Sequence, residues 1–175
     1  MSLEKVRERF AGTEMEGKIL ELGQSSATVE LAASALSCEP DRIAKSLSFL
    51  LGEGCVVVVV SGLSKIDNAK YKATFGAKAK MIPAEDVERL TGHAVGGVCP
   101  FALNEGCHVY LDESLRAYDF VFPAAGSTNS AVKMTIEQLE KFSGFKAWVD
   151  VTKKGNGRGF PSSYVCATHR PEASP

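Results

Sequence analysis

Five consecutive valines constrain the fold of this chain more than any other feature. Residues 56–60 are all valine, and glycines at positions 54 and 62 bound the run that begins at Cys55. β-branched side chains favour an extended backbone, and a strand without polar positions has no face to offer to water. We therefore predict a strand buried on both faces of a sheet. The preceding residues 42–52 predict a second strand directly before it.

Helix and strand patterns alternate along the rest of the chain. Apolar periodicity and terminal residues indicate the helices, and short β-rich runs between Gly, Asn, Asp or Ser indicate the strands. The predicted helices cover residues 3–10, 27–36, 66–76, 83–92 and 136–144. The further predicted strands cover residues 18–22, 79–82, 107–112, 118–126, 130–135 and 147–151.

Capping residues support three of these helices. Ser26 is the predicted N-cap of the second helix, and Asp67 lies near the start of the third. Thr135 and Gln138 have the spacing of a capping box at the start of the last helix.

This order of elements predicts one α/β domain of the α+β kind. About seven strands with four or five helices, without internal repeats or a long linker, fit a mixed curved sheet or a partly closed barrel surrounded by helices. The domain is predicted to cover residues 1–152. Residues 153–175 contain three prolines and three glycines and show little periodicity, so we predict an irregular C-terminal tail.

Charge and composition exclude several classes of protein. The net charge is only −1, so the chain has no field able to hold long stretches of nucleic acid, and a polyanion must be bound locally. The longest apolar run, residues 55–60, is far shorter than the roughly 20 residues needed to span a bilayer, which predicts no membrane partner. The N-terminus lacks the apolar core of a signal peptide, so we predict a cytoplasmic protein whose mature chain begins near Met1.

Motifs of common catalytic centres are missing. The sequence contains no GxxxxGK[ST] phosphate loop, no HExxH and no GxSxG elbow. The three histidines, His93, His108 and His169, do not share helical metal-ligand spacing, and the five cysteines lack CxxC spacing. We therefore predict reduced thiols and neither a zinc site nor a Ser-His-Asp hydrolase.

Lys45 is the first candidate functional residue, because it lies within an apolar strand. By the period of two, Ile43, Lys45, Leu47 and Phe49 share one face. If that face points inward, the ammonium group enters a partly buried cleft, where a lysine is suited to bind phosphate. The alternative is an ordinary surface lysine at an outward position.

A glycine-rich segment after the fourth predicted helix is the second candidate. Gly96 and Gly97 permit backbone conformations that other residues avoid, and Pro100 restricts the exit from the segment. Such a loop can present its own N–H and C=O groups to a ligand, and the apolar neighbours Val98 and Phe101 favour a pocket. The alternative is a structural turn that links a helix to a strand.

Two further features leave their chemistry open. Cys99 in the same segment is a nucleophile or a small packed side chain. A lysine-rich stretch is either a solvated face or a local contact with an RNA backbone. Its lysines are Lys65, Lys70, Lys72, Lys78 and Lys80.

Six short motifs occur in order within about residues 29–151. They are I-A-K-S-L, V-V-V-V-x-G, D-x-x-K, A-K-M, T-G-x-x-x-G-G-V-x-P and V-x-x-D-x-S-L. With these motifs the chain resembles the YbaK/EbsC family of aminoacyl-tRNA deacylases, relatives of the prolyl-tRNA synthetase editing domain. The resemblance implies a YbaK-like fold and a freestanding trans-editing enzyme. Such an enzyme hydrolyses the ester that joins a wrong, small amino acid to the 3′ CCA end of tRNA, often tRNA for proline.

The resemblance also implies roles for individual residues. Lys45 would hold the terminal adenosine and its phosphates, and Gly97 would place backbone groups against the ester. These two are the expected catalytic residues. The expected substrate-binding residues are Lys45, Gly96, Gly97, Val98, Cys99, Pro100 and Phe101. No metal or other cofactor is implied, because a hydroxyl of the terminal ribose, or the thiol of a cysteinyl substrate, can assist the attack.

Many relatives carry Ser where this chain has Cys99, which leaves the preferred amino acid undecided.

Two other functions remain open at this point. The protein could be a non-catalytic module that only holds the tRNA 3′ end or an aminoacyl-tRNA synthetase. It could also be an ester or thioester hydrolase that uses the Cys99 thiol.

Overall fold

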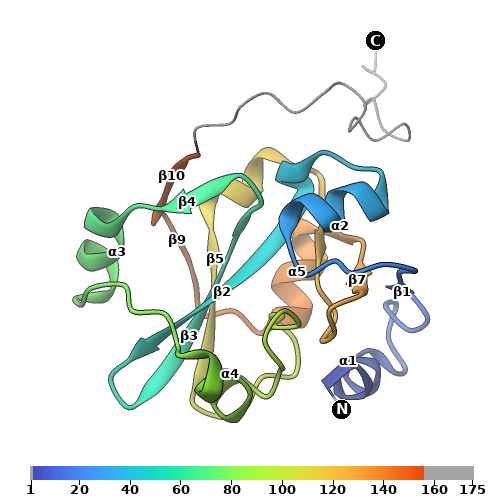
Figure 1. The fold of residues 1–175 in the computed structure, drawn as a ribbon, viewed down its shortest axis with the longest axis horizontal. Coiled ribbons are helices and arrows are strands. Elements are labelled where there is room, and N and C mark those ends of the chain that lie inside the picture. Colours follow the sequence, from blue (N-terminus) through green and yellow to red (C-terminus); the bar gives the residue numbers. More distant parts are fainter. Residues whose placement is uncertain (1, 156–175) are drawn as a thin grey trace.

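A six-stranded sheet forms the centre of the molecule, and the computed structural model describes residues 2–155 (Figure 1). The strands of this sheet are β2 (Ile43–Leu51), β3 (Gly54–Ser61), β5 (Cys107–Asp112), β6 (Phe120–Pro123), β8 (Met134–Thr135) and β9 (Ala147–Val149). Their spatial order is β8-β6-β2-β3-β5-β9. Pairs β2–β3 and β6–β8 are antiparallel, and the other neighbours are parallel. This arrangement confirms the predicted α/β domain with a mixed sheet.

Two short antiparallel pairs flank the main sheet. Strand β1 (Ile19–Glu21) pairs with β7 (Ser130–Val132), and β4 (Ser64–Ile66) pairs with β10 (Thr152–Lys154). Residues 2–155 therefore contain ten strands, more than the number predicted from the sequence.

Five α-helices and two short 3-10 helices lie around the sheet in the described residues. They are α1 (Ser2–Phe10), α2 (Val29–Leu36), α3 (Asn68–Phe75), α4 (Ala84–Thr91), α5 (Ile136–Ser143), η1 (Pro40–Arg42) and η2 (Glu113–Ala117). Helix α3 lies on one side of the sheet, and α1 and α5 lie on the other (Figure 1). Within these residues, no helix has both the length and the apolar composition needed to cross a bilayer.

The predicted helices are confirmed, with one wrong cap. At the start of α5, the Gln138 N–H donates to Thr135 Oγ1, and the Thr135 N–H donates to Gln138 Oε1, so the capping box is present. The N-cap of α2 is Thr28, whose Oγ1 accepts the Leu31 N–H at 3.2 Å. Ser26, the predicted cap, instead donates its N–H to Thr128 O at 2.6 Å.

The strand predicted over residues 79–82 is wrong. Met81 forms an isolated bridge with Phe49, and the Ile82 N–H donates to Ser48 O at 3.2 Å. The segment thus touches one edge of β2 without forming a ladder. Pro83, the N-cap of α4, follows at once and leaves no room for further pairing.

Strand β3 confirms the predicted burial on both faces, because each valine of 56–60 is at most 2% exposed. Val57 and Val59 belong to the core that contains α1 and α5, with Phe10 and Phe142. The other three valines belong to a second core with aromatic residues of α3. The sheet is therefore covered on both sides at its centre.

Strand β10 extends past the predicted end of the domain. Lys153 and Lys154, assigned from the sequence to an irregular tail, pair with Lys65 and Ser64 of β4. The Gly155 N–H also donates to Leu63 O at 3.1 Å. Cross-strand pairing with residues far back in the chain gives no local sequence signal, which explains the misplaced boundary. The rest of the predicted tail lies outside the described residues.

Candidate functional site

A cavity of about 440 Å³ lies beside strand β2, where one edge of β2 has no neighbouring strand. The pairing of β2 with β6 stops at the pair Ala44–Pro123. Farther along, the same edge of β2 meets the Ile82 N–H at Ser48 O. We call the intervening residues 45–47 the open edge. Since peptide groups alternate in direction along a strand, the N–H and C=O of Ser46 face this open edge.

Four segments besides β2 form the cavity walls, and most of their lining is apolar. The lining residues are Ser26–Val29, Ala32 and Leu36; Ile43–Ser48; Met81, Ile82, Ala84 and Val87; Val95, Gly96 and Val98; and Phe122, Ala124, Ser130 and Ala131. Among the described residues, no cluster of three or more His, Cys, Asp or Glu side chains could hold a metal ion.

The Lys45 ammonium is held by the turn between β3 and β4. Its Nζ donates to the carbonyl oxygens of Gly62, at 3.0 Å, and Ser64, at 2.6 Å. Burial lowers the pKa of this ammonium, and the nearby Glu30 carboxylate acts in the opposite direction. An ammonium group has three N–H donors, so one is left for a ligand after these two bonds.

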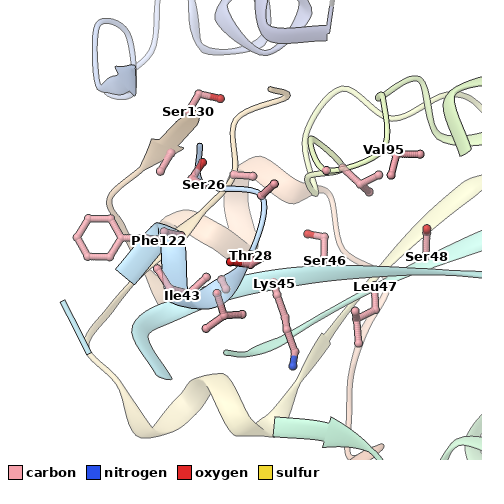
Figure 2. A pocket seen from close by; sticks show the side chains of 18 of the residues that line it. Ser26, Thr28, Ile43, Lys45, Ser46, Leu47, Ser48, Val95, Phe122 and Ser130 are labelled. Atoms are coloured by element: carbon pink, nitrogen blue, oxygen red, sulfur yellow. The ribbon is translucent and has the colours of Figure 1, made fainter. Parts of the chain in front are cut away.

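Side chains of β2 leave the strand on opposite sides. Figure 2 shows Lys45 and Leu47 on one side, and Ser46 and Ser48 on the other, toward Val95. The predicted alternation is therefore present. Lys45 and the glycine-rich segment border the same cavity, but they approach it from different faces of β2.

The segment after α4 contributes Val95, Gly96 and Val98 to the cavity wall. We call residues 94–100 the glycine loop. Gly96 has φ +85°, a conformation that L side chains rarely adopt. A Cβ on Gly96 would also lie 3.1 Å from Thr128 Cγ2. Glycine at this position lets the loop pack closely against the segment that follows β6.

Four of the predicted site residues do not line the cavity: Gly97, Cys99, Pro100 and Phe101. A Cβ on Gly97 would lie 3.1 Å from both the Cα and the backbone N of Ser127, so its role here is close backbone packing. Cys99 and Phe101 are fully buried in the main core. Pro100 borders a separate hollow near α5.

Cys99 contacts His93, but the pair is not arranged as a nucleophile and its base. His93 Nε2 lies 2.7 Å from Phe101 O and 3.4 Å from Cys99 Sγ. A carbonyl oxygen can only accept, so Nε2 carries a proton and cannot remove the one on the thiol. The thiol donates to the same carbonyl at 3.5 Å, and burial raises its pKa to about 12.

Native protein is therefore expected to resist alkylation at Cys99. At pH 8, iodoacetamide attacks thiolates, and a buried thiol with a raised pKa is almost entirely protonated. Mass spectrometry should find Cys99 unmodified in native protein and modified after denaturation in guanidinium chloride. Rapid modification of native Cys99 with parallel loss of hydrolytic activity would instead support the Cys99 hydrolase.

One wall of the cavity and the open edge could not be predicted from the sequence. Ser130 lies in a short strand far along the chain from Ser26, and no local pattern brings the two together. Ser46 is also part of the site: its hydroxyl is buried and has no hydrogen-bond partner among the described residues. The open edge begins where the β2–β6 pairing ends, between segments far apart in the sequence, so no local pattern marks it.

Three comparisons place the chain among known proteins. The family model of the aminoacyl-tRNA editing domain matches residues 24–142. The chain is 48% identical over 155 residues to the uncharacterized protein YwhH of Bacillus subtilis, covering 87% of this chain and 98% of that protein. It is 28% identical over 90 residues to a proline–tRNA ligase of Bacillus cereus, covering 51% of this chain and 16% of the ligase.

A solved structure of a similar protein has the same fold as this chain. A crystal structure described as a candidate trans-editing enzyme for prolyl tRNA synthetase has a TM-score of 0.77 and 31% sequence identity to this chain. The match covers 87% of this chain and 97% of the other. With a family model over residues 24–142 and this fold, the chain belongs to the aminoacyl-tRNA editing domain family.

Proposed function

We propose that this protein is a trans-editing aminoacyl-tRNA deacylase. It hydrolyses the ester that joins a mischarged small amino acid to the 3′ end of tRNA, with tRNA for proline as the expected substrate. The observation that carries the proposal is the cavity beside the open edge of β2, bordered by Lys45 and by the glycine loop in a chain of the editing-domain family.

The size and lining of the cavity suit a small amino acid next to a nucleoside. Its volume of about 440 Å³ falls within the usual range of small-molecule sites, and its lining is mostly apolar with a few polar groups. Apolar walls favour a small apolar side chain. Differences of one methylene between substrates are worth only about 1–3 kcal/mol, so selectivity depends on how closely the walls approach each other.

Lys45 supplies the positive charge of the site. Two of its N–H groups are bound to carbonyl oxygens of the β3–β4 turn, and the remaining one donates to a phosphate or ribose oxygen of the terminal adenosine. Because the two fixed bonds orient the ammonium before substrate arrives, little side-chain entropy is lost on binding. The protein as a whole carries almost no net charge, so this contact is local.

Hydrolysis in this proposal relies on orientation and on backbone donors. The ester is already an activated bond. The backbone N–H of Ser46 at the open edge can stabilise the oxyanion that forms when water attacks the carbonyl carbon. One well-placed donor of this kind is worth about 10²–10³ in kcat. A hydroxyl of the terminal ribose, or the thiol of a cysteinyl substrate, assists the attack, so the protein need not supply a nucleophile, and the proposed reaction uses no metal.

A panel of mischarged tRNAs tests the function. Purified protein treated with EDTA is incubated with tRNA for proline carrying alanine, cysteine, serine or proline, and release of the amino acid is followed. We expect at least one mischarged tRNA to be deacylated faster than prolyl-tRNA. Binding of tRNA without release from any member would favour the non-catalytic module, and activity lost with EDTA and restored by metal would contradict the proposed mechanism.

Two lysines of the β4–β10 pair, Lys65 and Lys153, are expected to contact the tRNA backbone. Lys65 and Lys153 are direct cross-strand partners and exposed, although like charges in this arrangement repel each other. We expect the double charge reversal Lys65→Glu with Lys153→Glu to raise KM for tRNA and leave kcat unchanged. The slope of log affinity for tRNA against log salt concentration should fall by about 2. The exposed Lys146→Glu is the control, and equal KM values in all variants would contradict the contact.

A further inference from the structure

His93 is a fully buried side chain at the start of the glycine loop, and it does not line the cavity. Its Nε2 donates to Phe101 O at 2.7 Å, across the base of the loop. The hydrogen bond therefore joins the two ends of the loop from behind the cavity wall.

Helix α4 holds the backbone of His93 in place. Thr91 Oγ1 accepts the His93 N–H at 3.1 Å and donates to Val87 O, one helical turn back, at 2.7 Å. Val87 itself lines the cavity. The helix end, the histidine and the far end of the loop thus form a continuous series of hydrogen bonds.

Stability alone does not account for a histidine at this position. Its Nδ1 is buried and has no hydrogen-bond partner among the described residues. A buried acceptor without a donor lowers stability, so an apolar side chain or a fully paired one would be the more stable choice. The useful part of the ring is the Nε2 donor that reaches Phe101 O.

The loop closed by this bond carries three cavity residues. Val95 and Gly96 are exposed, and Val95 is 58% exposed, whereas close packing of Gly96 and Gly97 against residues 126–128 supports the loop on one side. One hydrogen bond within the loop, from the Gly97 N–H to Ala94 O at 2.9 Å, shapes the turn without tying it to the rest of the protein. The hydrogen bond from His93 Nε2 to Phe101 O is therefore a second anchor of this wall, at the base of the loop.

We propose that His93 is a positioning residue for deacylation: through its bond to Phe101 O it sets the distance of the glycine loop from strand β2, and so the width of the amino-acid pocket. This role rests on the proposed function. A shift of the wall by the size of one methylene changes which side chains fit. Loss of the anchor therefore alters selectivity, whereas a general loss of folded protein lowers activity on all substrates equally.

Two substitutions separate the donor from the bulk of the ring. His93→Leu keeps a similar volume without a donor, and His93→Gln places an amide N–H near the position of Nε2. The exposed His108→Leu and His108→Gln are matched controls. Deacylation is measured on alanyl-tRNA and on the homologue one methylene larger, 2-aminobutyryl-tRNA, together with thermal unfolding and amide hydrogen exchange of residues 94–100.

We expect His93→Leu to lower kcat/KM for the preferred substrate by about tenfold and to reduce the ratio between the two substrates by at least about threefold. The rate of amide hydrogen exchange in the glycine loop should increase. His93→Gln should restore both the ratio and the protection, and the His108 variants should resemble wild type. An unchanged ratio and unchanged exchange in His93→Leu, or failure of His93→Gln to restore them, would overturn the proposal.

The same experiment keeps this proposal apart from the proposed function. If the wild type releases no amino acid from any tRNA, the function fails, and hydrogen exchange alone then decides whether His93 anchors the loop. If the wild type is active and the His93 variants match it, only the positioning role fails.

Discussion

Replacing Lys45 with alanine is expected to lower kcat/KM for deacylation by on the order of 10²–10³-fold, because the site loses its preorganised charge. The ammonium is half-buried and fixed by Gly62 O and Ser64 O, so no other cation takes its place easily. The measurement is release of the amino acid from the best mischarged tRNA of the panel, with enzyme in excess so that binding and chemistry are separated.

A second variant separates this effect from loss of fold. Lys45→Ala leaves two carbonyl oxygens without a donor, which costs about 1–3 kcal/mol each where they are buried. Lys45→Met removes the charge and the same N–H donors but keeps most of the apolar stem, so the two variants should differ in unfolding temperature through packing of the stem and share the loss of activity. The exposed Lys146→Ala should behave like wild type. Full activity in folded Lys45→Met would contradict the role of the ammonium.

Gly97→Val should remove activity by about 10²-fold or more, since small displacements of a site are costly to catalysis. A valine here would not fill the cavity but would press on backbone atoms, because a Cβ would lie 3.1 Å from the Cα and N of Ser127 and 3.2 Å from the C of Gly126. Backbone cannot rotate away as a side chain can, so the glycine loop would move.

Gly23→Val is the matched control for this substitution. A Cβ on Gly23 would meet no atom within 4 Å, so valine should be accepted there with little change in activity. Circular dichroism and thermal unfolding of both variants show whether the domain remains folded. Wild-type turnover by Gly97→Val would show that the loop does not need its close approach to residues 126–127.

Local sequence signals predicted the elements whose formation depends on their own residues. The five-valine strand, the capping box of α5 and the Asp67 cap of α3 are all present. Each depends on side chains within a few positions of one another. The 79–82 segment was mispredicted because apolar composition resembles a strand even where Pro83 ends the possible ladder.

The candidate site was predicted less completely, because contacts distant in sequence shape it. Lys45, Gly96 and Val98 line one cavity, yet the carbonyl partners of Lys45 lie on the turn after the next strand. The direction in which the Cys99 side chain points depends on the conformation of the whole loop. From the sequence, Cys99 was either a nucleophile or a small packed side chain, and its burial makes it part of the core.

The parallel pairing of β3 with β5 has a consequence for synthesis of the protein. Strands β2 and β3 form a hairpin from neighbouring residues, but β3 gains its other neighbour only when residues 107–111 are available. During translation the valine strand leaves the ribosome about fifty residues before its partner, with an unpaired edge and no cover. Until β5 arrives, the nascent chain presents a segment prone to self-association, so dependence on chaperones should be greatest at this stage of its production.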